Sequence, residues 1–152
     1  MVLISNVNIL VNIEMNTGLH ACKLDFILGE MKMLRLRQYK SCDADLIAEW
    51  AKDENGFLKW GGDHFCDYPI NAEIIDDEYN KNNGACTEPD NFYPWTAIDD
   101  DNRAVGHFIM RYTGGNSRQL RFGWVIVDDT LRGKGYGKQM LTLGLEYAFD
   151  IL

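Results

Sequence analysis

A glycine-rich turn at residues 132–138 carries the clearest chemical signal in this sequence. It reads Arg132-Gly-Lys-Gly-Tyr-Gly-Lys138, and it lies between an apolar run and an amphipathic segment. Such a turn gathers backbone N–H groups at the N-terminus of a helix, where partial positive charge accumulates. The glycines let a phosphate approach the backbone closely, and Arg132 and Lys138 add full charges. Pyrophosphate is the ligand that this surface suits; the alternative is a helix cap that binds nothing.

The spacing of the glycines excludes two common phosphate-binding motifs. A P-loop requires Gly, four further residues and then Gly-Lys-Ser/Thr. Counting back from Gly137 puts Arg132 at the first glycine and Gln139 at the hydroxyl position. The dinucleotide fingerprint requires a third glycine three residues after the second, and this chain has Lys138 there. Neither motif fits the turn.

Arg-Gly-x-Gly-x-Gly between a strand and a helix resembles the acetyl-CoA signature of the GNAT (Gcn5-related) N-acetyltransferases. The strand at 125–127, the leading Arg132 and the apolar pattern after the turn all agree with it, whereas Asp129 stands where the family commonly has Pro. The resemblance implies an α/β GNAT-like (acyl-CoA N-acyltransferase) fold, in which helices flank a mixed, mostly antiparallel sheet. It also implies acetyl-CoA as co-substrate, without a metal.

The same resemblance implies which residues contact the cofactor. The strand pairs with pantetheine through its main chain, the turn holds the pyrophosphate, and Tyr136 packs over the cofactor. The residues expected to do so are Val125, Ile126, Val127, Arg132, Gly133, Lys134, Gly135, Tyr136, Gly137 and Lys138. In the family a bulge in this strand points a backbone N–H at the thioester oxygen, and here we expect the bulge between Trp124 and Val127.

The general base is less clear from the sequence. His107 could take the proton of the amine, directly or through water, because the ordinary pKa of histidine lies near the working range; the alternative is a buried structural histidine. Asp63 and His64 lie in an aromatic-rich loop and could recognise or deprotonate an amine, or could simply be solvated. Asp128 follows the strand and is expected to form a turn or a cap. On the resemblance, the usual tyrosine acid falls at Ala21 or Cys22.

Hydrophobic periodicity predicts the elements that position these residues. Strands are expected at 33–39, 92–98, 104–113 and 120–127, and helices at 41–52, 71–82 and 135–150. Residues 56–69 are expected to form a loop whose Phe57, Trp60 and Phe65 line an acceptor pocket or belong to the core. This order matches the front of a GNAT domain and defines a core at 32–152.

The first residues raise a question of topology. Residues 6–14 are expected to form a strand, and residues 1–31 weakly resemble the later portion of the family, which normally follows the helix that ends near Leu152. We therefore expect a circularly permuted arrangement, in which residues 1–31 supply the missing strand and helix to their own chain or, swapped, to a homodimer. The alternatives are an unrelated arm on the same sheet edge and a truncated domain completed by dimerisation.

Composition limits the remaining possibilities. A chain of 152 residues suits one domain. Its net charge of −8 argues against nucleic-acid binding and allows a cationic amine, although acidity also simply aids solubility. The four cysteines form no Cys-x-x-Cys pair, which favours reduced thiols in a cytoplasmic protein over zinc. The apolar patch from Val2 to Ile13 is interrupted by asparagines, so neither a membrane span nor a signal peptide is expected.

These observations favour an acetyl-CoA-dependent N-acetyltransferase. It would transfer acetyl to a primary amine, either a small amine or the N-terminus of a peptide or protein, by direct attack on the thioester. The alternatives are a CoA-binding module without catalysis and a structural or interaction domain of the same fold.

Overall fold

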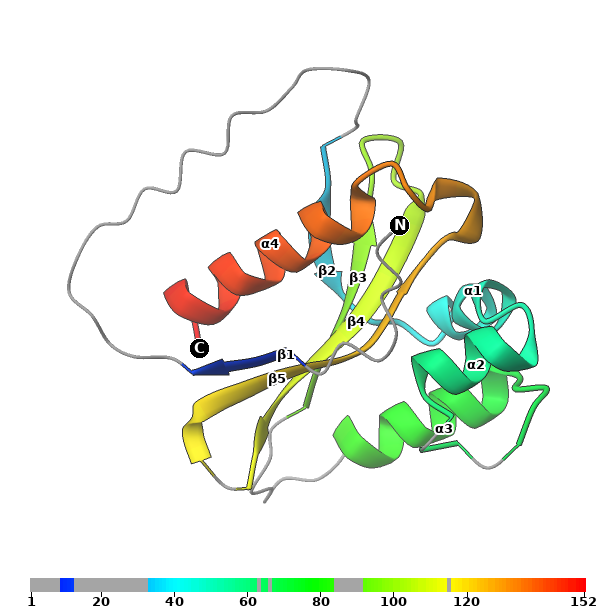
Figure 1. Ribbon diagram of the computed structural model, residues 1–152, viewed down its shortest axis with the longest axis horizontal. Helices are drawn as coiled ribbons and strands as arrows, with labels where there is room; N and C mark the ends of the chain where they lie inside the picture. The colour runs from blue at the N-terminus through cyan, green and yellow to red at the C-terminus, as the bar shows by residue number, and fades with distance from the viewer. Residues whose placement is uncertain (1–8, 13–32, 63, 66, 84–91, 115) are drawn as a thin grey trace.

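A five-stranded antiparallel sheet with helices on both faces forms the framework of the protein (Figure 1). The computed structural model describes residues 9–12, 33–62, 64–65, 67–83, 92–114 and 116–152. The sheet order is β1-β5-β4-β3-β2, and each neighbouring pair is antiparallel. In chain order the elements are β1 (Ile9–Asn12), β2 (Arg35–Gln38), α1 (Asp43–Trp50), α2 (Glu54–Trp60), α3 (Ala72–Asn83), β3 (Phe92–Ile98), β4 (Ala104–Thr113), β5 (Asn116–Val127), the short 3₁₀ turn η1 (Asp129–Leu131) and α4 (Tyr136–Asp150).

Two apolar clusters hold the helices to the sheet, one on each face. Among the described helices, α4 is the one that packs on its face of the sheet, and Figure 1 shows α1, α2 and α3 grouped away from it. Gly144 allows α4 to lie close to the strands, because a Cβ there would come within 2.8 Å of Phe108 and 2.7 Å of Phe122. The helix thus depends on the absence of a side chain at this position.

Most elements lie where the periodicity predicts them, and two differ. Residues 54–60 form α2, whereas the sequence analysis expected a loop at 56–69. The helix begins because the Asp53 side chain accepts the Gly56 N–H at 2.7 Å, and it persists because Phe57 and Trp60, three residues apart, are both buried. Strand β5 begins at Asn116, four residues before the predicted start at 120, so the β4–β5 connection is tighter than expected.

Strand β1 lies beside β5 of the same chain. Its register runs antiparallel from Ile9 opposite Phe122 to Asn12 opposite Gln119. The described part of β1 therefore covers only residues 119–122 of β5, and within the described residues no strand flanks that edge from Gly123 to Val127. The rest of the permuted arrangement expected for residues 1–31 falls outside the described residues and, like the homodimer, stays a prediction.

No helix within the described ranges combines the length and the apolar character needed to cross a bilayer.

Candidate active site

A bulge interrupts β5 at Trp124 and Val125. The pairing with β4 passes from His107 opposite Ile126 to Ile109 opposite Gly123, so that Phe108 faces two residues of β5. Trp124 has a φ of 47°, a left-handed conformation that a bulky residue adopts only where its surroundings impose it. The bulge expected between Trp124 and Val127 is therefore present, and it interrupts the regular backbone hydrogen bonding of the strand.

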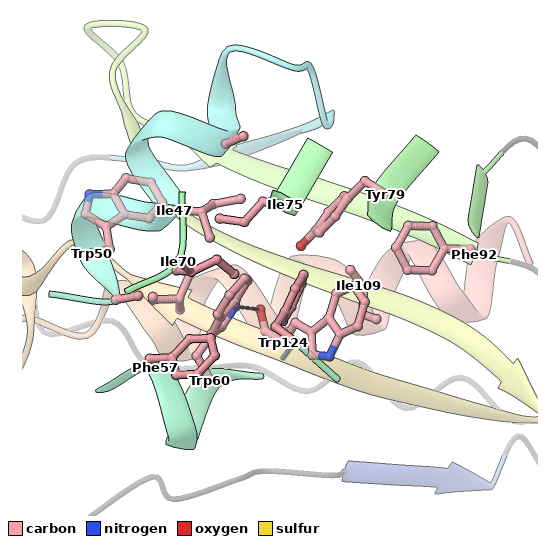
Figure 2. Packing of buried hydrophobic residues seen from close by; sticks show 14 residues of the cluster. Ile47, Trp50, Phe57, Trp60, Ile70, Ile75, Tyr79, Phe92, Ile109 and Trp124 are labelled. Atoms are coloured by element: carbon pink, nitrogen blue, oxygen red, sulfur yellow. Dashed lines mark hydrogen bonds between the residues drawn. The ribbon is translucent and has the colours of Figure 1, made fainter. Parts of the chain in front are cut away.

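Trp60 fixes the orientation of the bulged peptide. Its indole Nε1–H donates to the Trp124 carbonyl at 2.9 Å, and both rings are buried in the cluster on the α1–α3 face (Figure 2). In a trans peptide the carbonyl and the following N–H point in opposite directions, so the Val125 N–H points away from Trp60. From the sequence, Trp60 was expected only as an apolar wall or a core residue. The signal that could have found its role is that a buried indole N–H needs an acceptor.

The bulge also changes which side chains of β5 point to each face of the sheet. Before it, Leu120 and Phe122 belong to the cluster under α4, whereas after it Ile126 belongs to the cluster on the α1–α3 face. A single extra residue has this effect because side chains alternate with a period of two. Val125 and Val127 consequently pack against the α4 side, and their main chain lies at the part of the β5 edge that no described strand covers.

The glycine-rich turn connects η1 to α4 through two left-handed glycines. Gly133 has a φ of 78° and Gly135, the N-cap of α4, a φ of 86°. A Cβ at Gly133 would meet nothing within 4 Å, so the backbone there is open to solvent. The Gln139 N–H bonds the Gly135 carbonyl at 3.1 Å, and the amides of 136–138 therefore precede the first α-helical hydrogen bond of α4. This geometry suits an anion at the helix N-terminus.

Cationic side chains surround the turn. Arg132, Lys134 and Lys138 are exposed, and Gly137 approaches Val127 without a side chain in between. Tyr136 differs from the expectation that its ring packs over the cofactor: the side chain is buried in the cluster under α4. The reason is that the first residue of α4 faces the sheet, so only its backbone amide is placed to contact a ligand.

Asp129 links the turn to a distant cation. Its carboxylate lies 2.8 Å from Lys52 Nζ and 2.8 Å from Arg132 Nη1. The hydrogen bond from Lys52 and the charge of Arg132 hold the pKa of Asp129 below its ordinary value. Because Lys52 and Arg132 are exposed and Asp129 is partly exposed, this bridge contributes little stability. It does position Arg132 beside the glycines. Asp128 caps η1 by accepting the Thr130 N–H at 2.9 Å, which confirms its predicted role.

His64 lies at the bulge. Its exposed ring contacts Trp124 edge-to-face with centroids 5.3 Å apart. Phe65 also contacts Trp124, and it stacks on Trp60 with centroids 5.0 Å apart. Phe57, Trp60 and Phe65 are all buried, so they serve as core that supports the site. Asp63, the second predicted residue of this loop, lies outside the described residues.

His107 is fully buried and belongs to a polar chain beneath the site. Its Nε2 lies 2.7 Å from the Tyr79 hydroxyl, and its Nδ1 lies 3.4 Å from Thr96 Oγ1. Thr96 donates its proton to Asp43, so the threonine oxygen can only accept, which assigns the proton to Nδ1 and leaves Nε2 to accept from Tyr79. Burial lowers the pKa of His107 to about 3. The imidazole is therefore neutral, and a role as base stays a prediction that would have to act through Tyr79.

Asp43 anchors the outer end of this polar chain. It accepts two hydrogen bonds of 2.6 Å from Arg37, one from Thr96 and one from the Lys40 N–H. Burial alone would raise the pKa of Asp43, and these hydrogen bonds reverse that effect and lower it. The sequence alone did not single out Asp43, because its role depends on β2 and β3, whose Arg37 and Thr96 both donate to this carboxylate.

The comparisons with known proteins agree with this geometry. A family model described as an acetyltransferase (GNAT) domain matches residues 33–152. The chain therefore belongs to the GNAT acetyltransferase family, whose members use acetyl-CoA. This confirms the family and the fold that the glycine spacing predicted. No curated protein matches the sequence significantly.

Solved structures with the same fold are distant in sequence. The spermidine N-acetyltransferase of Vibrio cholerae, solved with CoA and spermine, is 18% identical, with a TM-score of 0.61 over 78% of this chain and 65% of that one. FdhC, a nucleotide-linked sugar GNAT solved in its apo form, is 20% identical, with a TM-score of 0.53 over 80% of this chain and 65% of that one. The chain thus spans less than two thirds of either structure, and the likeness shows the fold alone.

Proposed function

We propose that this protein is an acetyl-CoA-dependent N-acetyltransferase that transfers acetyl to a primary amine. The observation that carries the proposal is the arrangement of residues 124–138. One continuous segment contains a locked bulge with the Val125 N–H turned away from Trp60, followed by a cationic turn of left-handed glycines at a helix N-terminus. The first feature suits a thioester oxygen, and the second suits a pyrophosphate.

Acetyl-CoA would lie along this segment. Its pyrophosphate would accept hydrogen bonds from the amides of Gly133 and of residues 135–138, because the Lys134 N–H already donates to the Leu131 carbonyl at 3.3 Å. The side chains of Arg132, Lys134 and Lys138 would supply charge. Its pantetheine arm would pair with the main chain of Val125 and Val127, where the described part of β1 leaves the edge of β5 uncovered. The ten residues predicted as cofactor contacts would then line one path, although Ile126 and Tyr136 would offer only their backbones because their side chains are buried.

The reaction would be a direct displacement. The amine nitrogen attacks the thioester carbonyl, a C–N bond forms and the C–S bond breaks, and the CoA thiolate leaves with a proton. The Val125 N–H stabilises the negative charge that develops on the carbonyl oxygen, a contribution worth roughly a hundredfold in rate or more in enzymes of this kind. No side chain is required for that step.

His64 is the best-placed candidate to take the proton from the amine. Its ring is exposed and lies against Trp124, the residue that carries the bulge. His107 has its acceptor nitrogen occupied by Tyr79 and is enclosed by protein. We therefore favour His64, directly or through a water molecule, with Asp63 as a neighbour in sequence that could orient it.

Two measurements test the proposal. Calorimetric titration with acetyl-CoA should give saturable binding, and release of free thiol in the presence of an amine panel should exceed release without amine. Binding without amine-dependent thiol release would support the non-catalytic module instead. Absence of binding would leave only a structural or interaction domain of this fold.

A further inference from the structure

Two arginines lie directly opposite each other in the middle of the sheet. Arg111 of β4 pairs with Arg121 of β5, and Phe92 of β3 pairs with Arg111 on the other side. Phe92 belongs to the cluster on the α1–α3 face, whereas Leu120 and Phe122 on either side of Arg121 belong to the cluster under α4. Since side chains alternate along a strand, both arginines project from the α1–α3 face, the face on which Trp124 and His64 meet.

Neither arginine is neutralised within the part of the chain that the structure describes. The ion pairs found there involve other cations, and both side chains are half-buried. Arg121 Nε is enclosed and has no hydrogen-bond partner. Arg37, by contrast, is held by two hydrogen bonds to Asp43. Like charges directly opposite on neighbouring strands are destabilising, so this pair needs a compensating anion.

The arginine pair lies next to the proposed acyl site. Gly123 separates Arg121 from the bulge and leaves the strand face open, since a Cβ there would have only Ile109 nearby, at 3.5 Å. The Trp124 ring extends towards the arginine pair. It contacts Phe92, the residue opposite Arg111 on β3, edge-to-face with centroids 5.8 Å apart. At a rise of about 3.3 Å per residue, Arg121 lies about 10 Å along the strand from the bulge. A molecule with its amine at the bulge can therefore reach the arginines with its other end.

We propose that Arg111 and Arg121 bind an oxyanion carried by the acceptor, so that the substrate is an amine with a carboxylate or phosphate group several bonds from its nitrogen. The inference rests on the proposed acetyl transfer and names its substrate class. Two guanidinium groups side by side match the geometry and the charge of such a group. The same pair repels a polyamine, whose far end carries positive charge.

Matched acceptors test the substrate class. Putrescine and 4-aminobutanoate share a four-carbon chain and one amine, but the second end is an ammonium in one and a carboxylate in the other. Ethanolamine and phosphoethanolamine make the same comparison for phosphate. We expect kcat/KM to be about tenfold higher or more for an anionic member of a pair, the scale of a charge-assisted hydrogen bond, and the larger of the two ratios identifies the oxyanion. Equal values or a preference for putrescine would overturn the proposal.

Arginine variants test the residues. Arg111→Gln and Arg121→Gln should remove the preference by raising KM for the anionic acceptor, and should leave the neutral acceptor unchanged. Arg118→Gln, an exposed arginine on the same strand, is the matched control and should keep the preference. If both arginines are merely structural, their variants will melt at lower temperature and yet keep the wild-type preference, which would contradict the proposal.

A binding measurement separates this inference from the proposed function. Phosphoethanolamine and 4-aminobutanoate should raise the melting temperature of the wild type, and neither should raise that of Arg121→Gln. This result holds even if the protein fails to bind acetyl-CoA, in which case the acetyltransferase proposal falls and the oxyanion site stands. If acetyl-CoA binds but neither anionic amine protects the wild type, the oxyanion site is wrong and the acetyltransferase proposal stands.

Discussion

Gly133 and Gly114 have the same left-handed backbone in different surroundings. Their φ values are 78° and 63°, and a Cβ at either would meet nothing within 4 Å. Gly133 lies in the proposed pyrophosphate turn, whereas Gly114 lies in the distant β4–β5 connection. Adding a side chain therefore costs the same backbone strain at both positions. The difference is that a methyl group at Gly133 would also obstruct the proposed pyrophosphate site.

This matched pair gives the first prediction. Gly133→Ala and Gly114→Ala should each lower the free energy of unfolding by about 1–2 kcal/mol, because an L-residue is strained at positive φ. Only Gly133→Ala should also weaken acetyl-CoA binding, by about tenfold, since its methyl group stands where the phosphate approaches the backbone. Denaturant titration measures the first effect and calorimetry the second. Equal affinities in the two variants would show that the turn is only a cap.

His107 gives a prediction for pH dependence. Burial lowers its pKa from the ordinary 6.5 to about 3 in the folded protein. Between these values the unfolded chain binds the proton and the folded chain does not, so stability rises with pH across this window. The stabilisation is complete above 6.5 and is lost progressively as the pH falls towards 3. His107→Asn should flatten the slope of the unfolding free energy by up to about 1.4 kcal/mol per pH unit.

Nuclear magnetic resonance provides a direct check on the same histidine. The His107 ring should keep the shifts of a neutral imidazole with the proton on Nδ1 as the pH is lowered through 6.5. A titration of that ring at its ordinary value would contradict both its burial and the polar chain through Tyr79 and Thr96.

At the scale of elements, α2 controls the shape of β5. The helix was not predicted, yet it carries the indole that holds the Trp124 carbonyl. Trp60→Phe keeps an aromatic side chain but removes the indole N–H and part of the ring volume, so the bulged peptide loses its hydrogen bond. We expect a loss of about 1 kcal/mol in stability and a fall in kcat of roughly tenfold or more, with acetyl-CoA affinity unchanged.

Trp50→Phe is the control for that prediction. Trp50 is buried in the same cluster, and within the described residues its indole makes no hydrogen bond to β5. This variant should keep the wild-type kcat. If the two variants retain equal kcat, the Trp60 hydrogen bond does not matter for the chemistry, and the bulge is held by packing alone.

The sequence was most informative where local chemistry decides the structure. Glycine spacing at 133–137 identified the turn, and alternation located β3 and β4, because both signals depend on neighbouring residues. It was least informative where distant segments meet. The meeting of Arg111 with Arg121 depends on the register between strands, and the bridge from Lys52 to Asp129 depends on where α1 ends. Helix α2 was missed because a short helix with aromatic residues has weak propensity and is held by burial.

At the scale of the whole molecule, β1 extends one edge of the sheet over residues 119–122 of β5. A cysteine pair tests whether that strand comes from the same chain. Asn12 and Gln119 are directly opposite in the register, and opposed residues on antiparallel strands are close enough for a disulfide. In a protein whose natural cysteines are replaced by serine, Asn12→Cys with Gln119→Cys should form a disulfide within one chain. A covalent dimer would show instead that the strand is exchanged between partners.

The described chain also brings its cationic groups together despite its net charge of −8. Arg132, Lys134 and Lys138 surround the turn, and Arg111 and Arg121 lie on the sheet beyond the bulge. The proposed acetyl-CoA and the proposed anionic acceptor would therefore each meet local positive charge on a protein that repels anions at long range. Raised salt should weaken both interactions, because these charges are partly exposed.

Titration of ¹⁵N-labelled protein with acetyl-CoA reports on the amides of the bulge and of the glycine-rich turn themselves. We expect the amide signals of Val125 and of residues 133–138 to shift as acetyl-CoA is added, and that of Gly114 to stay unchanged. Binding that leaves the Val125 and 133–138 amides unmoved, or no binding at all, would contradict the proposed cofactor site.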